Sequence, residues 1–531
     1  MTVNINFFLL FYLTIFLGGG QHYARIYPLL HMKHKLFTLS LVSLFLGSIA
    51  YAQNAEVNKV ISSNQSGTLI VNPAANTNYT VTIDEGVTYT NTTMRVVNDV
   101  SPTGSNTYLV TGDGNLIVSC ERKDHAVVLG NGSNKTPNSS IIFDVNTTIN
   151  KGSAGGSNLT LTNEINVSFY KNLNASELTL GDNGGVANSL VTFGKADATD
   201  TYTATLNKIS AKTNTFTVNS NYTVNVASSI NAKSINLVGG TMTGTTISAA
   251  SLSMTSGSLT GTIITADSIN MTGGTINATT ISAKTANLSK GTISVNTISS
   301  ADAIESLTIS GGSITAKKEL YVGDTLVTSG GLYTSEGLSI KTGSTLTQKG
   351  GTVHGSYGLR FSTGSTYEYY KGTGPSQIVT SGGTVKLYNN FATGLIKVNG
   401  ANTLDLYWNG FSVILAGSSG ATQGLFTDGN ANATFNLIVE SGYNWENDKL
   451  FIGNITEDQL YARIGAIQIG DTRYEKGEWY EIIELVAGTT VYNSKDVSGF
   501  YINLVNVPEP AEWALIFGTI AFGFIAYRRR K

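Results

Sequence analysis

The densest run of chemically reactive side chains in this 531-residue sequence is Cys120-Glu121-Arg122-Lys123-Asp124-His125. A cysteine nucleophile needs a base such as histidine within hydrogen-bond reach. A separation of five residues on a strand or turn does not provide that geometry, so we interpret the run as a charged loop with a half-buried cysteine. Cys120 is the only cysteine, so no intramolecular disulfide can form and packing and backbone pairing must supply the stability.

Histidines and carboxylates are too scattered to predict a metal site. Of the five histidines only His125 and His354 follow the N-terminal 52 residues, which is too few for a zinc site of histidine and cysteine ligands. No calcium-binding pattern recurs among the acidic residues. Examples of their scatter are Asp84, Glu85, Asp113, Asp182, Asp197 and Asp200. We predict no catalytic, cofactor-binding or metal-binding residue, and hence no enzyme.

A carbohydrate-active enzyme is the alternative, because parallel β-helices also carry polysaccharide lyases and glycosidases. Such enzymes need paired carboxylates, or a basic residue beside bound calcium. Active sites on a solenoid are assembled from distant coils, and a fold alone says little about function. The sequence leaves this alternative open.

Pairs of hydroxyl or amide side chains recur at a spacing of 17 residues. They are Thr241/Thr243, Ser258/Thr260, Thr275/Asn277 and Thr292/Ser294. Stacked strands would align these pairs into a polar ladder. Solenoid ice-binding proteins use Thr-x-Thr ladders, so ice binding is a second alternative, although serine and asparagine would roughen the match to a lattice. The simpler interpretation is that such residues suit the outward face of a strand.

Aromatic residues gather late in the chain, at Tyr357, Phe361, Tyr367, Tyr369, Tyr370, Tyr407, Trp408 and Phe411. An exposed row of tyrosines could stack on sugar rings, since these side chains combine an apolar ring with a polar end. Filling of the core explains the same row equally well. Exopolysaccharide is therefore an expected partner that the sequence alone does not establish.

The element that must position the polar pairs is a 17-residue repeat. Its four units are INAKSINLVGGTMTGTT (230–246), ISAASLSMTSGSLTGTI (247–263), ITADSINMTGGTINATT (264–280) and ISAKTANLSKGTISVNT (281–297). Apolar residues alternate with polar ones, which is typical of strands, and glycine or small residues mark corners. Seventeen residues are too few for a strand–helix–strand crossover. Each unit is predicted to form one coil of a β-solenoid, with a set of β-sandwiches as the alternative.

The predicted fold is all-β, a right-handed parallel β-solenoid with a small α+β C-terminal cap and one C-terminal transmembrane helix. Residues 53–229 form an N-terminal β-rich region, residues 230–315 the repeat, and residues 316–440 further coils. After a four-residue insertion, 306–315 matches 268–277. Residues 441–506 are predicted to cap the open end, because the ends of a stack need caps. Within them Thr456 and Gln459 form a predicted capping box at a short helix.

The charge balance argues against a nucleic-acid partner. Only 13% of residues are charged. Residues 53–507 hold 26 lysines and arginines against 33 acidic residues, a formal charge of −7, and show no basic patch. Nucleic-acid binding therefore has no electrostatic support.

The N-terminal region predicts export. Met32-Lys33-His34-Lys35 is basic, Leu36 to Gly47 is apolar, and Ala50 and Ala52 place a signal cleavage before Gln53. We therefore assign 32–52 as a Sec-type signal peptide and interpret 1–31 as an upstream extension from a mis-assigned start. An additional N-terminal membrane span is the alternative for residues 7–17.

The C-terminal region predicts an anchor. Pro508-Glu509-Pro510 precedes an apolar run from Ala511 to Tyr527 and the basic end Arg528-Arg529-Arg530-Lys531. The apolar run is just long enough to cross a bilayer as a helix. The four cations should stay in the cytoplasm, which places the body of the chain across the inner membrane. An ordinary tail anchor would have the same topology.

The Pro-Glu-Pro triplet beside a short span and a basic end resembles the PEP-CTERM sorting signal. The resemblance implies that an exosortase cuts near the triplet and releases the protein or attaches it at the cell surface. The xTGSTLTQxGGTV rhythm of residues 320–355 resembles the β-helix passengers of autotransporter-like surface proteins. Residues 445–469 resemble the module that precedes the tail in autotransporter-type PEP-CTERM proteins. These resemblances imply a non-catalytic, adhesin-like or structural protein of the cell surface or extracellular biofilm matrix.

Overall fold

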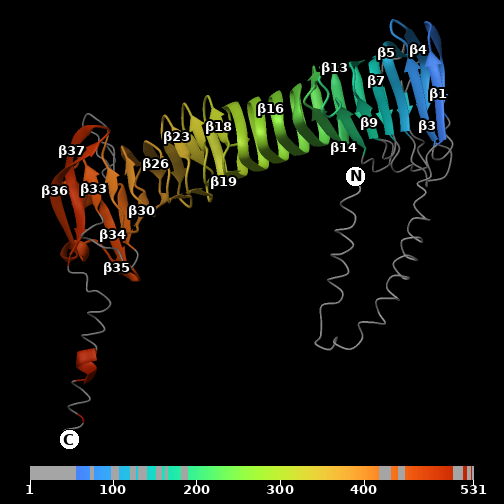
Figure 1. The fold of residues 1–531 in the computed structure, drawn as a ribbon. Helices are drawn as coiled ribbons and strands as arrows, with labels where there is room; N and C mark the ends of the chain where they lie inside the picture. The colour runs from blue at the N-terminus through green and yellow to red at the C-terminus, as the bar shows by residue number, and fades with distance from the viewer. Residues whose placement is uncertain are drawn as a thin grey trace, which may run out of the picture. The chain divides into compact units, whose positions relative to one another are not determined.

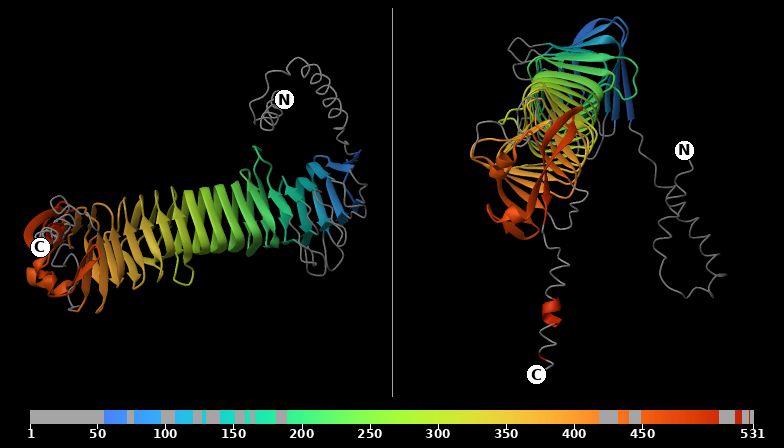
Figure 2. Two further views of the ribbon diagram at one scale, coloured as in Figure 1. Left: turned by 90° about the horizontal axis from the view of Figure 1, so that it is seen from below. Right: turned by 90° about the vertical axis from the view of Figure 1, so that its left-hand side faces the viewer.

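The computed structural model describes residues 55–71, 77–96, 107–119, 127–129, 140–150, 158–161, 166–180, 189–417, 432–439, 449–505, 518–522 and 528. The chain divides into two compact units, Met1–Ala55 and Glu56–Lys531. All described residues except Ala55 belong to the second unit. Its strands follow one another as successive turns of the chain (Figures 1 and 2).

The repeat forms the long strand β16 (Ser229–Thr297), which winds through three faces in each coil. It pairs in parallel with the preceding coil on all three faces. Strand β14 (Lys208–Asn219) contacts the first face through Ile209 and Ile230, and the second through Phe216 and Ile235. Strand β15 (Tyr222–Val226) contacts the third face beside Met242. Ile230, Ile235 and Met242 are all buried, so the predicted alternation places the apolar side chains inside.

The three faces continue on both sides of the repeat. The first face also contains β2 (Gln65–Val71), β4 (Thr88–Val96), β6 (Val127–Leu129), β8 (Asn158–Leu161), β11 (Glu177–Leu180), β17 (Ile304–Ile309), β19 (Leu320–Val327), β21 (Leu338–Ile340), β24 (Leu359–Ser362), β26 (Gln377–Ser381) and β29 (Leu395–Val398). The second contains β1 (Ala55–Ile61), β3 (Thr77–Ile83), β5 (Thr107–Ser119), β7 (Ser140–Asn150), β9 (Asn166–Phe169), β12 (Leu190–Phe193), parts of β17 and β19, β22 (Thr345–Gln348), β25 (Thr366–Tyr369), β27 (Gly383–Leu387), β30 (Thr403–Trp408), β32 (Thr434–Val439) and β34 (Ile464–Ile469). The third contains parts of β2, β4, β5 and β7, then β10 (Leu173–Ala175), β13 (Tyr202–Leu206), β18 (Ser313–Ala316), β20 (Gly331–Thr334), β23 (Thr352–Gly355), β28 (Phe391–Thr393), β31 (Val413–Leu415) and β33 (Leu450–Gly453).

The parallel pairing confirms an all-β fold of stacked parallel strands. β-Sandwiches are built from antiparallel sheets, so that alternative is excluded for the described strands. The four-residue insertion is also confirmed. Ile298 keeps its place in the first face, opposite Leu320, and pairing resumes at Ile304 opposite Ala283. Residues 299–303 therefore replace the single residue Ser282 of the preceding coil, which makes four additional residues.

Corner glycines allow the coils to stack closely. Gly257 and Gly274 adopt positive φ angles of 87° and 81°. A Cβ on Gly257 would lie 2.2 Å from the Gly240 carbonyl oxygen, and one on Gly274 would lie 2.9 Å from that of Gly257. Only glycine combines this backbone conformation with such a close approach of the previous coil.

The interior is filled by columns of side chains that repeat from coil to coil. In the coils before the repeat, Phe143, Phe169, Phe193 and Phe216 stack with ring centroids 5.2, 5.7 and 6.1 Å apart. The column continues into the repeat as aliphatic residues, beginning with Ile235 opposite Phe216. Each coil therefore buries its core only against its neighbours, as expected of a solenoid.

The stack ends in antiparallel strands. β33 pairs with β37 (Lys495–Leu504), which pairs with β36 (Ile483–Tyr492), and β34 pairs with β35 (Thr472–Tyr474). Helix α3 (Glu457–Arg463) and the 3₁₀ helix η1 (Trp479–Glu481) belong to the same end. The predicted capping box of Thr456 and Gln459 is confirmed by both of its hydrogen bonds. These strands occupy backbone edges that the last parallel coil would otherwise expose.

Of the predicted membrane-spanning segment, only residues 518–522 are described, and they are helical. Within the described residues there is no helix with the length and apolar character needed to cross a membrane.

Candidate binding surfaces

Several predicted functional residues lie outside the described residues. These are Ala50, Ala52 and Gln53 of the signal cleavage, Pro508, Glu509 and Pro510 of the sorting signal, Arg529, Arg530 and Lys531 of the basic end, and the run 120–125. Arg528 is described and exposed. In the described parts of the chain, no three His, Cys, Asp or Glu side chains converge as metal ligands would.

In the N-terminal coils, Asp113 and Asp200 each form a contact of their own. Asp113 accepts a 2.7 Å hydrogen bond from Lys171, which lowers the pKa of the Asp113 carboxyl. Asp200 accepts a 3.4 Å hydrogen bond from the Tyr202 hydroxyl. Neither has a second described carboxylate as its partner, so their geometry is that of single structural contacts.

The predicted polar pairs lie on the outer side of the third face, on either side of a buried residue such as Leu259 or Ile276. Strand pairing extends them beyond the repeat in both directions. We call the set the third-face ladder: Thr203/Thr205, Thr223/Asn225, Thr241/Thr243, Ser258/Thr260, Thr275/Asn277, Thr292/Ser294 and Ser313/Thr315. None of these side chains is charged. In the sequence, each added pair also flanks a single apolar residue, but its distance from the neighbouring pair is not 17 residues.

Some ladder groups hydrogen-bond to one another. The Thr243 hydroxyl donates to the Asn225 side-chain oxygen at 3.0 Å. On the second face, Asn287 likewise donates to Asn270 at 2.9 Å. Such bonds stabilise the stack, and they still leave each hydroxyl or amide with capacity for a further partner.

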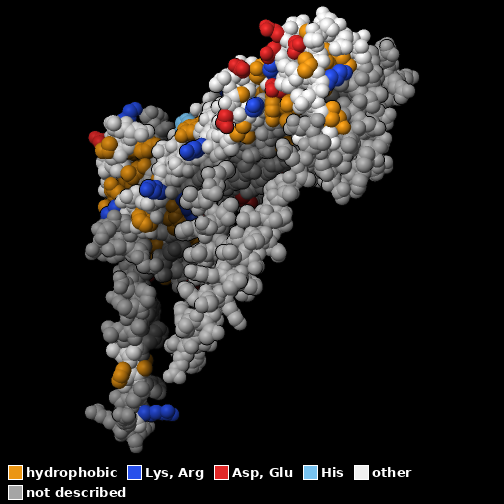
Figure 3. Space-filling view, turned by 45° about the vertical axis from the view of Figure 1, so that its right-hand side comes forward, with side chains coloured by type: hydrophobic (Ala, Val, Ile, Leu, Met, Phe, Trp, Pro, Cys, Tyr) orange, Lys and Arg blue, Asp and Glu red, His pale blue; other side chains and the backbone are white. Residues whose placement is uncertain are grey.

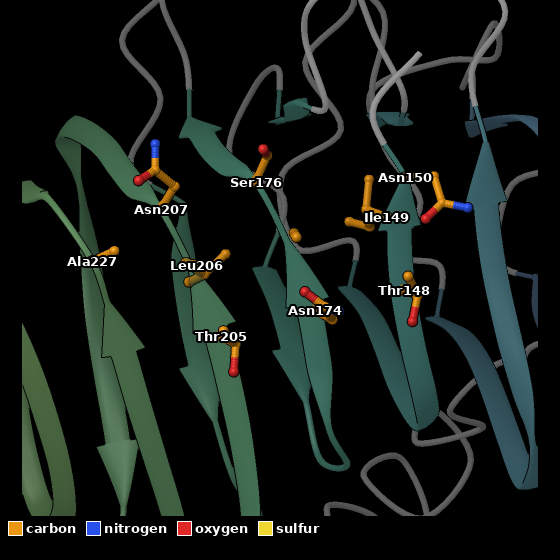
Figure 4. Close-up of a pocket in the computed structure, with 10 residues that line it drawn as sticks. Thr148, Ile149, Asn150, Asn174, Ser176, Thr205, Leu206, Asn207 and Ala227 are labelled. Atoms are coloured by element: carbon orange, nitrogen blue, oxygen red, sulfur yellow. The ribbon is translucent and has the colours of Figure 1, made fainter. Parts of the chain in front are cut away.

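A hollow of about 400 Å³ lies at the N-terminal end of the ladder (Figure 4). Thr148, Asn174 and Thr205 form a row across neighbouring strands, because Asn174 pairs with both threonines. The remaining lining residues are Ile149, Asn150, Ala175, Ser176, Leu206, Asn207 and Ala227. The hollow therefore offers hydroxyl and amide groups, with no titratable side chain among its lining residues. These groups both donate and accept, as do the hydroxyls of a sugar.

The predicted aromatic row is divided between core and surface. Phe361, Tyr367, Tyr369 and Trp408 are buried, whereas Tyr357 and Phe411 are exposed and Tyr370 and Tyr407 are half-buried. The hydroxyl of Tyr367 donates to Gln348 Oε1 at 2.7 Å, and burial raises the pKa of Tyr367. Core filling therefore explains half of the row.

The surface tyrosines belong to a group that we call the lysine–tyrosine patch: Lys349, Glu368, Tyr370, Lys386, Tyr388 and Tyr407. Tyr388 was not among the predicted aromatic row, because it lies apart from the other aromatic residues in the sequence. On the second face, Glu368 pairs with Lys386, and Lys386 with Tyr407, on consecutive strands β25, β27 and β30. The side chains of Lys386 and Glu368 form a 3.2 Å salt bridge.

Cations and rings alternate in this patch. The Tyr370 and Tyr388 rings stack at 4.4 Å with an interplanar angle of 11°. Lys349 Nζ lies 5.4 Å from the centre of the Tyr370 ring, and Lys386 Nζ lies 5.4 Å from that of Tyr407. Lys349 and Tyr388 come from the coils on either side of Tyr370, so both faces of its ring are covered. Tyr370 therefore does not offer a sugar a face for stacking.

The charge of residues 341–397 differs in sign from that of residues 53–507 as a whole, which have a formal charge of −7. Between residues 341 and 397 stand Lys341, Lys349, Arg360, Lys371, Lys386 and Lys397, against Glu368 alone. The net charge of residues 53–507 is negative, so it does not reveal this local excess of basic residues. Figure 3 shows acidic side chains gathered toward one end of the visible face, whereas basic ones predominate toward the C-terminal coils.

Comparison of the chain with protein-family models, with curated proteins and with solved structures finds no match.

Proposed function

We propose that the protein is an exported, non-catalytic component of the cell surface or extracellular matrix. Its solenoid, which we take to wind in the right-handed sense usual for parallel crossovers, acts as a structural, adhesin-like spacer. The solenoid holds extracellular polysaccharide through many weak contacts along its outer faces.

The third-face ladder with its hollow is the observation that carries this proposal. Uncharged hydroxyl and amide groups recur at every coil of the ladder, about 4.8 Å apart along the stack. A polysaccharide chain lying along this direction presents hydroxyls at a comparable repeat. Each contact would be weak, but many linked contacts raise the overall affinity steeply.

The termini support export. The signal peptide (32–52) and the Pro508-Glu509-Pro510 signal indicate Sec export, a transmembrane intermediate held by residues 511–527 and Arg528 to Lys531, and processing by an exosortase. Mass spectrometry of the mature protein from its native host tests this directly. We expect an N-terminus at Gln53 and loss of residues 511–531; retention of that segment would leave an ordinary membrane anchor.

Binding to a neutral polysaccharide tests the ladder. We would replace Thr203, Thr205, Thr241 and Thr243 together by valine, which removes the hydroxyls and keeps the branched shape. Retardation of the full chain in a dextran-containing native gel should fall by about tenfold in apparent affinity, because several linked contacts are lost at once. Valine substitutions of Thr192, Thr215, Thr217 and Thr308, four threonines on the outer side of the second face, are the matched control and should have little effect.

Two outcomes contradict the proposal. Equal retardation of the ladder variant and the control would remove the ladder from polysaccharide binding. A freezing-point gap in a thermal-hysteresis assay, without any retardation by polysaccharide, would assign the ladder to ice.

A further inference from the structure

We infer that the lysine–tyrosine patch is a second, separate binding site, whose ligand is an acidic polysaccharide that carries carboxylates on its sugars. The site lies on the second face, over β22, β25, β27 and β30. It goes beyond the proposed function, which rests on the uncharged third face, because it assigns a different surface and a charged class of ligand.

The first step is the availability of positive charge. Lys349 and Lys371 are exposed, and neither forms a salt bridge with any residue that the structure describes. Lys371 follows Tyr370 directly at the corner where β25 ends. Two unneutralised ammonium groups thus lie on neighbouring coils, in a chain whose formal net charge is −2. Such a local excess attracts anions selectively.

The second step is preorganisation. A free lysine side chain loses much rotamer freedom when it binds a ligand. Lys349 and Lys386 are already held over the rings of Tyr370 and Tyr407 by cation–π contacts. The stacking of Tyr388 on Tyr370 in turn fixes the first of these rings. The tyrosines therefore serve the patch as supports for cations.

The third step is spacing. Lys349 follows β22, Lys371 follows β25 and Lys386 lies within β27, so cations recur on consecutive coils. Coils are about 4.8 Å apart. A polyuronate extended along the stack carries one carboxylate on each sugar and can meet several of these cations at once. Linked contacts of this kind bind far more tightly than one alone.

The fourth step distinguishes the ligand from a nucleic acid. The patch also contains Glu368, which accepts hydrogen bonds from Thr347 and Lys386, and it borders Asp405, which accepts one from Asn436. These carboxylates can accept hydrogen bonds from sugar hydroxyls. They repel the densely spaced phosphates of a nucleic acid more than the carboxylates of a polyuronate, which are separated by uncharged hydroxyls.

The experiment compares alginate, a polyuronate, with neutral dextran and with double-stranded DNA, using the full chain. Lys349→Gln combined with Lys371→Gln removes two charges and keeps most of each stem. We expect affinity for alginate to fall by about tenfold or more at low salt and the remaining binding to lose most of its salt dependence, because exposed charges are screened by salt. Retardation by dextran should not change.

The matched control is Lys317→Gln with Lys318→Gln. It removes the same charge from exposed lysines at another corner, so it separates a local site from the effect of net charge. Circular dichroism of both variants checks that the fold is intact.

Each outcome is decisive. Equal losses in the patch variant and the control, or alginate binding no stronger than dextran binding, would overturn the inference and leave the proposed function standing. DNA binding as tight as alginate binding would overturn it in favour of a nucleic-acid site. Absence of binding to either polysaccharide would reject both the patch and the ladder.

Discussion

The repeat coils of β16 and the coils from β22 to β30 share one winding but differ in what they hold. Residues 229–297 contain no aromatic residue, and their charged side chains are Lys233, Asp267, Lys284 and Lys290. Residues 345–408 contain tyrosine, phenylalanine and tryptophan inside the coil, and further tyrosines outside it. Coils of equal length with small side chains produce a uniform ladder in the repeat, whereas close glycine corners such as Gly257 and Gly351 occur in both regions. The later coils vary in length, and they bring lysine, glutamate and tyrosine side chains together in the lysine–tyrosine patch.

The difference shows what a larger interior requires. Tyr367 is completely buried with a polar hydroxyl. Its partner Gln348 is also buried and donates to the carbonyl oxygens of Gly351 and Thr373 at 3.2 and 2.9 Å. The aliphatic repeat needs no such internal hydrogen bonds. In these coils the polar ends of the buried Tyr367 and Trp408 side chains thus have hydrogen-bond acceptors, because an unpaired buried polar group is costly.

The largest expected effect separates a corner where two coils approach closely from an open corner. Gly257→Ala should destabilise the fold by about 3 kcal/mol or more, because strain at positive φ is joined by a clash with the Gly240 carbonyl. Gly343→Ala, also at positive φ but with no atom within 4 Å of the new Cβ, should cost about 1 kcal/mol from strain alone. Chemical denaturation followed by circular dichroism measures both. Equal midpoints would show that the close approach of the Gly240 carbonyl adds nothing to the strain of a positive φ.

The next effect concerns the buried polar network. Tyr367→Phe leaves Gln348 Oε1 without its donor and should cost about 1–3 kcal/mol in free energy of unfolding. Tyr407→Phe removes a hydroxyl from a half-buried surface ring and should change stability by less than about 0.5 kcal/mol. The same denaturation assay checks the pair. If the two variants unfold alike, the network is not what stabilises the larger coils.

A smaller effect concerns ligand affinity. Tyr370→Leu removes the ring beneath Lys349 and leaves the charge in place. Loss of an exposed cation–π contact of about 0.5–1 kcal/mol corresponds to a roughly threefold weaker binding of alginate. Tyr321→Leu on the first face is the control. An unchanged dissociation constant for Tyr370→Leu, measured by isothermal titration, would mean that the ring does not preorganise the lysine.

The smallest effect concerns an exposed ion pair of the repeat. A hydrogen bond and charge from Asp267 raise the pKa of Lys284 above its usual value, and their atoms lie 2.8 Å apart. Because the folded-state pKa is raised, the stabilisation is present below the ordinary lysine pKa and disappears as pH rises through the raised value. The thermal midpoint of Lys284→Gln should lie slightly below that of the wild type at pH 7. The two midpoints should converge once the pH exceeds the raised pKa of Lys284; a difference that persists there would have another origin.

Features that depend on neighbouring residues could be predicted from the sequence. Alternation placed Ile235 and Leu237 inside, and glycine at Gly257 and Gly274 marked corners, because strand geometry and backbone conformation act over a few residues. The insertion after Ile298 and the capping box at Thr456 could also be predicted, because each depends on residues that are close in sequence. Tyr369 and Tyr370, in contrast, are adjacent and equally aromatic, and only the end of the strand decides which one points inward.

The chemistry of the patch was decided by tertiary structure. Thr347 and Glu368 are 21 residues apart and Glu368 and Lys386 are 18 apart, so no single period in the sequence aligns them. The repeat has one coil length, and its ladder is therefore readable directly from the sequence. The later coils vary in length, and their outward side chains meet only after each coil has closed on the one before it. The sequence by itself determined the solenoid, its corners and its polar ladder; the stacking of unequal coils decided where the cations lie.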